Sequence, residues 1–189
     1  PPFNHTFNPV FALFPFLSFV VLIPLMMFAT EPSLKKAMGH SALFGFFASI
    51  SQYFWIGFVT AEGLWHLILI GVVLIALFFG FFYFCAAMFF RALIQKFPRL
   101  YLLFFPALWV CIDYFRTLGE ISFPWSFLGY SLAPFTPVIQ IASITGVWGL
   151  TFLIVLINCL LWDLLKKYSI NSDIVPRWIH LSVLALFLC

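Results

Sequence analysis

The amino-acid sequence predicts an all-α fold, a polytopic bundle of transmembrane helices. Three observations lead to this class: the composition, the long apolar runs and the placement of the charges. Of the 189 residues, 65% are hydrophobic and only 8% are charged, and the mean hydropathy is +1.13. A soluble domain has about 25% charged residues. A soluble core of this size cannot bury so much apolar surface, so we expect lipid around the helices.

Apolar runs separated by short polar connectors predict about five complete spans and a truncated sixth. The expected spans are residues 10–29, 41–59, 66–90, 100–117 and 138–162, with a partial one over 178–189. Each is expected to be helical, because a span in lipid cannot leave its backbone groups unpaired. As a helix, the last run is about 18 Å long, shorter than the roughly 30 Å of hydrocarbon in a bilayer. We therefore expect residues 1–189 to be the transmembrane domain of a longer protein.

The positive charges fall in alternate connectors. The connectors on one side contain Lys35, Lys36, Arg91, Lys96, Arg99, Lys166, Lys167 and Arg177. Those on the other side contain Glu62 and Glu120, and their only lysine or arginine is Arg116 at a helix end. Cytoplasmic connectors are enriched in lysine and arginine. The basic connectors are therefore expected in the cytoplasm, and residues 123–131 and any chain after Cys189 on the outer face.

The sequence shows no motif of a catalytic, metal or cofactor site. Its cysteines occur singly, without a CxxC pair, and its histidines lack the spacing of a metal-binding motif. It has no P-loop, no GxGxxG and no GxSxG. No basic stripe indicates nucleic acid. We expect no catalytic residue, no metal and no cofactor in this stretch, and no nucleic-acid partner.

Polar residues at membrane depth are the first candidates for a functional role. Asp113 and Arg116 lie three residues apart, so they share a helical face and can pair. Ionisable residues inside a span often mark a functional site. The alternative is that Arg116 reaches outward to lipid headgroups while Asp113 neutralises it. Gln140 and Asn158 are expected to form hydrogen bonds across helices of the bundle.

The outward-facing stretch FPWSFLGYS (123–131) is the second candidate. Its proline and glycine, with further glycines and prolines beside it, indicate an irregular but shaped backbone. Trp125 and Tyr130 each combine an apolar ring with a polar tip, which suits the level of the lipid headgroups. Two interpretations remain open. The stretch is either an aromatic belt with turn residues, or a lipid-access site at which Arg116 lies near a phosphate.

A family resemblance covers most of the chain. The segment PALWVCIDYFRTLGEISFPWSFLGYS, followed by QIASITGVWGLTFLIVLIN, resembles the membrane part of bacterial apolipoprotein N-acyltransferases. The early segments PPFN and FGFFASISQYFWI also fit that family. Asp113 stands where the family more often has glutamate.

This resemblance implies an acyltransferase of the bacterial inner membrane. Such enzymes transfer an acyl chain from a phospholipid to the amine of an N-terminal diacylglyceryl-cysteine in a lipoprotein. They act through a thioester on a cysteine of a Glu–Lys–Cys triad, in a nitrilase-like α/β domain that would follow residue 189. Residues 1–189 alone are therefore expected to be inactive. The resemblance points to Arg116, Trp125, Tyr130 and Asp113 as substrate-binding residues, with the FPWSFLGYS stretch in the periplasm.

Two alternatives belong to other functional classes. One is a membrane scaffold for polyprenol-phosphate mannosyl transfer, which a neighbouring cytoplasmic glycosyltransferase domain would reveal. The other is part of a non-enzymatic transporter. A transporter is expected to have broken spans with polar residues at the midplane, often in repeated halves.

Overall fold

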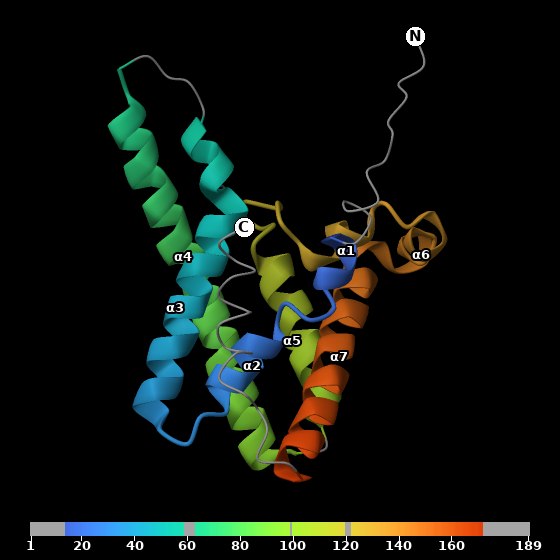
Figure 1. The fold of residues 1–189 in the computed structure, drawn as a ribbon. Coiled ribbons are helices and arrows are strands. Elements are labelled where there is room, and N and C mark those ends of the chain that lie inside the picture. Colours follow the sequence, from blue (N-terminus) through green and yellow to red (C-terminus); the bar gives the residue numbers. More distant parts are fainter. Residues whose placement is uncertain (1–13, 59–62, 99, 120–121, 172–189) are drawn as a thin grey trace. The chain divides into compact units, whose positions relative to one another are not determined.

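The computed structural model describes residues 14–58, 63–98, 100–119 and 122–171, and all regular structure within these ranges is helical (Figure 1). The all-α prediction is confirmed for these residues. The α-helices are α1 (Phe14–Leu17), α2 (Ile23–Ala29), α3 (Leu34–Tyr53), α4 (Trp65–Lys96), α5 (Tyr101–Phe115), α6 (Thr136–Ile139) and α7 (Ala142–Asn171). The 3₁₀ helices are η2 (Phe54–Phe58) and η3 (Leu128–Leu132).

Two helices are long and apolar enough to cross a membrane, by length and composition: Trp65–Lys96 and Ala142–Lys167. They correspond to the expected spans 66–90 and 138–162. Helix α5 is apolar but shorter. The number of spans beyond these two stays a prediction. Parts of the expected spans 10–29 and 41–59, and the whole partial span over 178–189, lie outside the described residues.

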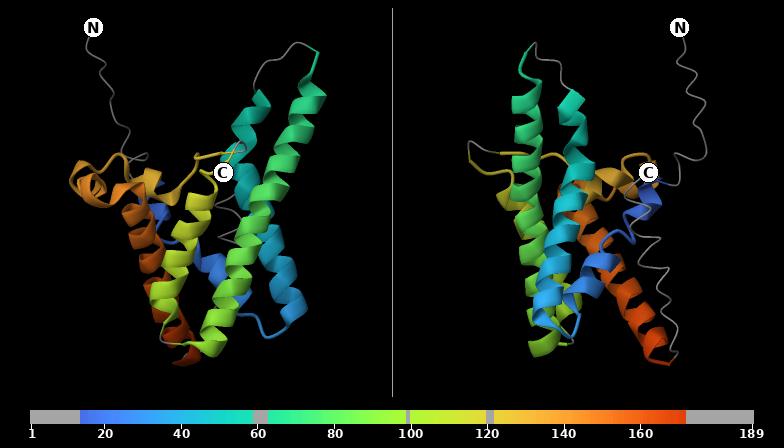
Figure 2. Two further views of the ribbon diagram at one scale, coloured as in Figure 1. Left: turned by 180° about the vertical axis from the view of Figure 1, so that it is seen from behind. Right: turned by 60° about the vertical axis from the view of Figure 1, so that its left-hand side comes forward.

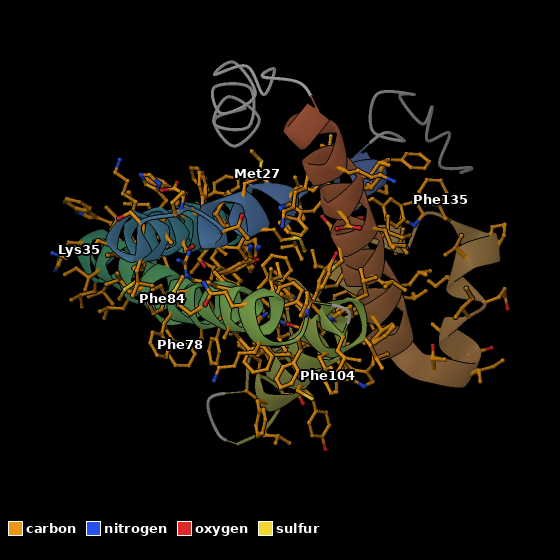
Figure 3. The ribbon with its side chains drawn as sticks, turned by 90° about the horizontal axis from the view of Figure 1, so that it is seen from below. Met27, Lys35, Phe78, Phe84, Phe104 and Phe135 are labelled. Atoms are coloured by element: carbon orange, nitrogen blue, oxygen red, sulfur yellow. The ribbon has the colours of Figure 1, made fainter. Side chains whose placement is uncertain are left out.

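The chain forms two compact units, Pro1–Ile23 with Leu102–Leu161, and Pro24–Tyr101 with Trp162–Cys189. The second unit is built on the antiparallel pair α3 and α4, which run side by side (Figures 1 and 2). Small residues allow the two backbones to approach closely: a Cβ atom on Gly45 would lie 2.5 Å from the carbonyl oxygen of Gly80. On its outer side α4 exposes large apolar side chains such as Phe78 (Figure 3). We expect these side chains to face lipid.

Polar side chains join the elements of this second unit. Gln52 of α3 donates a hydrogen bond to the hydroxyl of Tyr83 on α4 at 2.5 Å. Arg91 of α4 donates to the carbonyl oxygens of Ala29 (2.9 Å) and Glu31 (2.6 Å), at and just beyond the end of α2. The last carbonyls of a helix have no partner within it. Arg91 therefore supplies partners for carbonyls at the end of α2.

The first expected span is not one helix. Helix α1 ends at Leu17 and α2 begins at Ile23, and turns connect them. Asn158 of α7, fully buried, accepts a hydrogen bond from the backbone N–H of Leu22 (2.9 Å) and donates to the carbonyl of Ser18 (2.8 Å). Its amide also donates to Ile154 within α7. Non-helical backbone at membrane depth is tolerated where protein satisfies its polar groups. The expected hydrogen bonding by Asn158 is confirmed. Its partners, however, are backbone groups of the non-helical segment between α1 and α2, and not groups of a second helix.

The fifth expected span starts later than predicted. The chain turns at Gln140 and Ile141 between α6 and α7, so the prediction that Gln140 lies within the span is wrong and its side chain is exposed. Within α7, Gly146 has φ +65° and ψ −171°, which interrupts the helix near its start. Glycine adopts this left-handed φ without the steric cost that a Cβ atom imposes. The uninterrupted part of α7 therefore begins after Gly146.

The hydrogen bonds of Asn158 to the non-helical segment 18–22 give the first prediction. Replacing Asn158 with leucine leaves the N–H of Leu22 and the carbonyl of Ser18 buried and unpaired, at about 1–3 kcal/mol for each group. We expect a clearly lower melting temperature for the full-length protein in detergent. Leu160→Ala, at an exposed position of the same helix, should change it little. Equal melting temperatures for wild type and Asn158→Leu would contradict this role.

Candidate functional site

The FPWSFLGYS stretch forms most of a loop over residues 122–132, hereafter the 122–132 loop, in the first unit (yellow to orange in Figure 1). After α5 ends at Phe115, the chain turns back, and the N–H of Phe123 donates to the carbonyl of Arg116 at 2.9 Å. Residues 122–127 have no regular structure, and the loop closes in the helix η3. The loop is therefore anchored to the end of α5 by its backbone.

The predicted pair of Asp113 and Arg116 is confirmed. Nη1 of Arg116 lies 3.0 Å from Oδ1 of Asp113, and the two side chains are only 8% and 2% exposed. The guanidinium is thus buried beneath the loop, which disfavours the alternative of an arginine that reaches outward to headgroups. Oδ2 of Asp113 is also buried and has no hydrogen-bond partner among the described residues.

Arg116 also holds the middle of the loop. Its Nη2 donates to the carbonyl of Trp125 at 3.1 Å, and its Cζ lies 5.4 Å from the ring centroid of Phe127. Ser126, between these two contacts, has φ +66° and is the only non-glycine residue with positive φ in the described ranges. Such a conformation costs of order 1–3 kcal/mol and persists only where its surroundings impose it. Arg116 contacts the chain on both sides of this strained residue.

A cluster of aromatic side chains connects the loop to its neighbouring helices. The buried ring of Phe127 stacks on Tyr130, with centroids 5.4 Å apart, and lies 5.2 Å from the ring of Trp148 on α7. Trp148 in turn lies 5.8 Å from Tyr114 of α5. The loop therefore packs against both α5 and α7. Sequence reasoning did not single out Phe127 or Trp148, because an aromatic residue in an aromatic-rich chain gives no distinctive pattern.

The closing turn of the loop packs against α7 at a glycine. The N–H of Gly129 donates to the buried hydroxyl oxygen of Thr151 at 3.1 Å. A Cβ atom at position 129 would lie 2.6 Å from the carbonyl oxygen of Val147. Below this contact, Leu132 packs with Leu150 and Ile154 in a buried cluster. Only glycine allows the backbone to come so close to α7.

The remaining two predicted residues lie on the surface of the loop. Trp125 is 49% exposed and Tyr130 is 50% exposed. The ring of Trp125 packs on Phe123 with centroids 4.9 Å apart. The structure thus brings all four predicted site residues to one junction of α5 with the loop. Asp113 and Arg116 lie beneath it, whereas Trp125 and Tyr130 face outward.

The junction contains aromatic rings and a buried ion pair that is hydrogen-bonded to the loop. No reactive group is evident there within the described ranges. Over those ranges, no group of three His, Cys, Asp or Glu side chains could hold a metal ion. Cys85, Cys111 and Cys159 are free thiols. Cys189 lies outside the described residues. The groups that the described residues offer at this junction are aromatic rings and hydrogen-bonding side chains.

The described residues define a helical protein with two helices suited to crossing a membrane and an aromatic loop held by a buried ion pair. Comparison with known protein families identifies the family to which this helical protein belongs. A sequence model of the apolipoprotein N-acyltransferase N-terminal domain matches residues 5–160. The chain therefore belongs to the apolipoprotein N-acyltransferase family, as the resemblance of its motifs predicted.

Curated relatives agree with this assignment. Apolipoprotein N-acyltransferase 1 of Treponema denticola is 27% identical over 165 residues, 85% of this chain and 28% of the relative. The apolipoprotein N-acyltransferase of Borreliella burgdorferi is 29% identical over 153 residues, 79% of this chain and 28% of the relative. That of Geobacter metallireducens is 46% identical over 68 residues, 36% of this chain and 13% of the relative. The matched part is thus less than a third of each relative. No solved structure matches the chain significantly.

The contact between the loop and α7 gives the second prediction. In Gly129→Ala, the added Cβ atom would overlap the backbone oxygen of Val147, and overpacking of this kind costs about 1–3 kcal/mol. We expect the full-length protein to melt at a lower temperature and the loop to be cut faster by protease. Gly71→Ala is the matched control, because a Cβ atom there meets nothing within 4 Å. If both variants behave alike, the close contact at Gly129 does not hold the loop.

Proposed function

We propose that this chain is the membrane part of an enzyme that acylates lipoproteins. In the proposal, an acyl chain passes from a phospholipid to the amine of an N-terminal diacylglyceryl-cysteine. A cysteine thiolate attacks the phospholipid ester, releases a lysophospholipid and becomes a thioester. The lipoprotein amine then attacks the thioester and frees the thiolate. Membership of the apolipoprotein N-acyltransferase family supports the proposal. We propose that the Glu–Lys–Cys triad lies in an α/β domain after residue 189.

We propose that the 122–132 loop lies in the periplasm, because most basic residues of the chain fall in the alternate connectors on the other side. In the second unit, α3 begins and α4 ends at the same end of the helix pair (Figures 1 and 2). Trp162 of α7 packs on Phe90 near that end, with centroids 5.2 Å apart. The basic residues of this end are Lys35, Lys36, Lys96, Lys166 and Lys167. A concentration of lysines at one end favours a cytoplasmic position for it.

The proposed role of the loop rests on two exposed aromatic rings, those of Trp125 and Tyr130, on a backbone held by hydrogen bonds. Trp125 and Tyr130 are half exposed, although Arg116 and Gly129 tie the backbone beside them to α5 and α7. Aromatic side chains with a polar tip are favoured where acyl chains meet headgroups. We propose that these two rings contact the phospholipid as it approaches the catalytic domain. We propose that Arg116 and Asp113, whose side chains are 8% and 2% exposed beneath the loop, belong to the same site.

The proposed reaction predicts two labelled products. The full-length protein is placed in nanodiscs with a phospholipid that carries a radiolabelled acyl chain. Before an acceptor is added, we expect a protein-bound label that hydroxylamine releases, as it does from a thioester. A diacylglyceryl lipopeptide with a free amine should then become labelled, whereas the same peptide with an acetylated amine should not. If neither product forms, the proposed function is wrong.

Trp125→Ala gives the prediction for the loop. Loss of one aromatic contact worth about 1.5 kcal/mol should lower kcat/KM for the phospholipid about tenfold, with little change in the yield of folded protein. Trp65→Ala is the control, since Trp65 is also exposed but lies at the start of α4. Equal losses of activity and folded yield in Trp125→Ala would show that the loop serves packing alone.

A further inference from the structure

The contacts of the Arg116 side chain with other described residues include three of different kinds. Nη1 pairs with the carboxylate of Asp113, Nη2 donates to the carbonyl of Trp125, and the guanidinium lies over the ring of Phe127. A guanidinium is planar and offers several N–H donors in fixed directions, so one side chain can satisfy such contacts together. A lysine ammonium is a point charge and cannot reproduce this arrangement.

The segment between Phe123 and Phe127 depends on such a partner. The N–H of Phe123 binds the carbonyl of Arg116 at one end, and the carbonyl of Phe127 accepts from Tyr130 at the other. Between them the backbone has no regular structure, includes the positive φ of Ser126, and is held at the carbonyl of Trp125 by Arg116. Loss of that hydrogen bond removes a restraint beside the strained residue.

Asp113 allows Arg116 to occupy this buried position. A buried charge is costly unless it is paired and hydrogen-bonded. The carboxylate neutralises the guanidinium and fixes one of its nitrogens, which directs Nη2 toward the loop. A pair that served helix stability alone could lie on the surface, or be replaced by apolar residues at little cost. The buried pair therefore fits a role in fixing one conformation of the loop.

We infer that Arg116, oriented by Asp113, is a positioning residue that sets the conformation of the 122–132 loop and through it the placement of Trp125 for the phospholipid. This inference rests on the proposed function. In this inference Arg116 acts through Trp125 and not by binding the lipid headgroup, since its side chain is only 8% exposed and holds both Asp113 and the Trp125 carbonyl.

The test uses Arg116→Lys in the full-length protein, since lysine keeps the charge beside Asp113 but loses the reach to Trp125. We expect faster hydrogen exchange in peptides covering residues 122–132, unchanged exchange in α4, and a roughly tenfold lower kcat/KM for the phospholipid through a raised KM. Arg91→Lys is the matched control. Arg91 also donates to backbone carbonyls, but it lies in the other unit, so loop exchange and KM should not change.

A double variant tests whether Arg116 acts through Trp125. If it does, Arg116→Lys combined with Trp125→Ala should lose no more activity than Trp125→Ala alone, because coupled residues have non-additive effects. Multiplied losses would overturn the inference. The inference would also be overturned if Arg116→Lys lost activity while hydrogen exchange in the loop stayed unchanged, because that indicates direct contact of Arg116 with lipid. Faster hydrogen exchange in the loop with an unchanged KM for the phospholipid would overturn it as well. Absence of transfer by the unmodified protein would instead overturn the proposed function, and the exchange comparison would still decide whether Arg116 holds the loop.

Discussion

Backbone groups that leave a helix in apolar surroundings need a hydrogen-bond partner, because no water is there to supply one. In this chain single polar side chains meet that need. Asn158 forms hydrogen bonds with the non-helical segment between α1 and α2, and Arg91 donates to carbonyls at the end of α2. Thr151 accepts a hydrogen bond from the backbone N–H of Gly129. Arg116 also donates to a backbone carbonyl, that of Trp125, in the exposed 122–132 loop. The irregular segments of the fold depend on these few contacts.

The same constraint explains how an exposed loop can be well defined. The 122–132 loop has little regular structure, yet both of its ends and its middle bind α5 or α7 through named hydrogen bonds. The ring of Phe127 fills the space beneath it and contacts Trp148. What remains outside is a small set of amphipathic rings at fixed positions. A surface of this kind suits a lipid substrate, whose acyl chains offer few polar groups for recognition.

The sequence predicts those features that depend on composition and local spacing. Apolar runs predict the helical class, and the spacing of Asp113 and Arg116 predicts their ion pair on one helical face. The order of motifs in residues 106–158 identifies the family, because it combines many positions. The four candidate site residues meet at one junction, although their contact with a substrate stays a prediction.

Features that depend on tertiary contacts could not be predicted in this way. The apolar run over 10–29 looks continuous, and only the distant side chain of Asn158 explains why the chain breaks within it. The expected span begins before α7 does, because the apolar pattern gives no sign of the turn at Gln140 and Ile141. Thr151 was missed because its role depends on the N–H of Gly129, which the fold brings beside it. No local pattern in the sequence indicates that Arg116 faces the carbonyl of Trp125.

Photocrosslinking can show whether the 122–132 loop contacts the phospholipid that is the proposed acyl donor. A photoreactive phenylalanine analogue replaces Tyr130 in the full-length protein, and in a second sample it replaces Phe58, which is exposed in η2. Both samples are irradiated with a tagged phospholipid. We expect saturable labelling at position 130 that excess untagged phospholipid removes, and only weak, unsaturable labelling at position 58. Equal, unsaturable labelling at both positions would show that the loop contacts bulk lipid alone and has no specific site for the phospholipid.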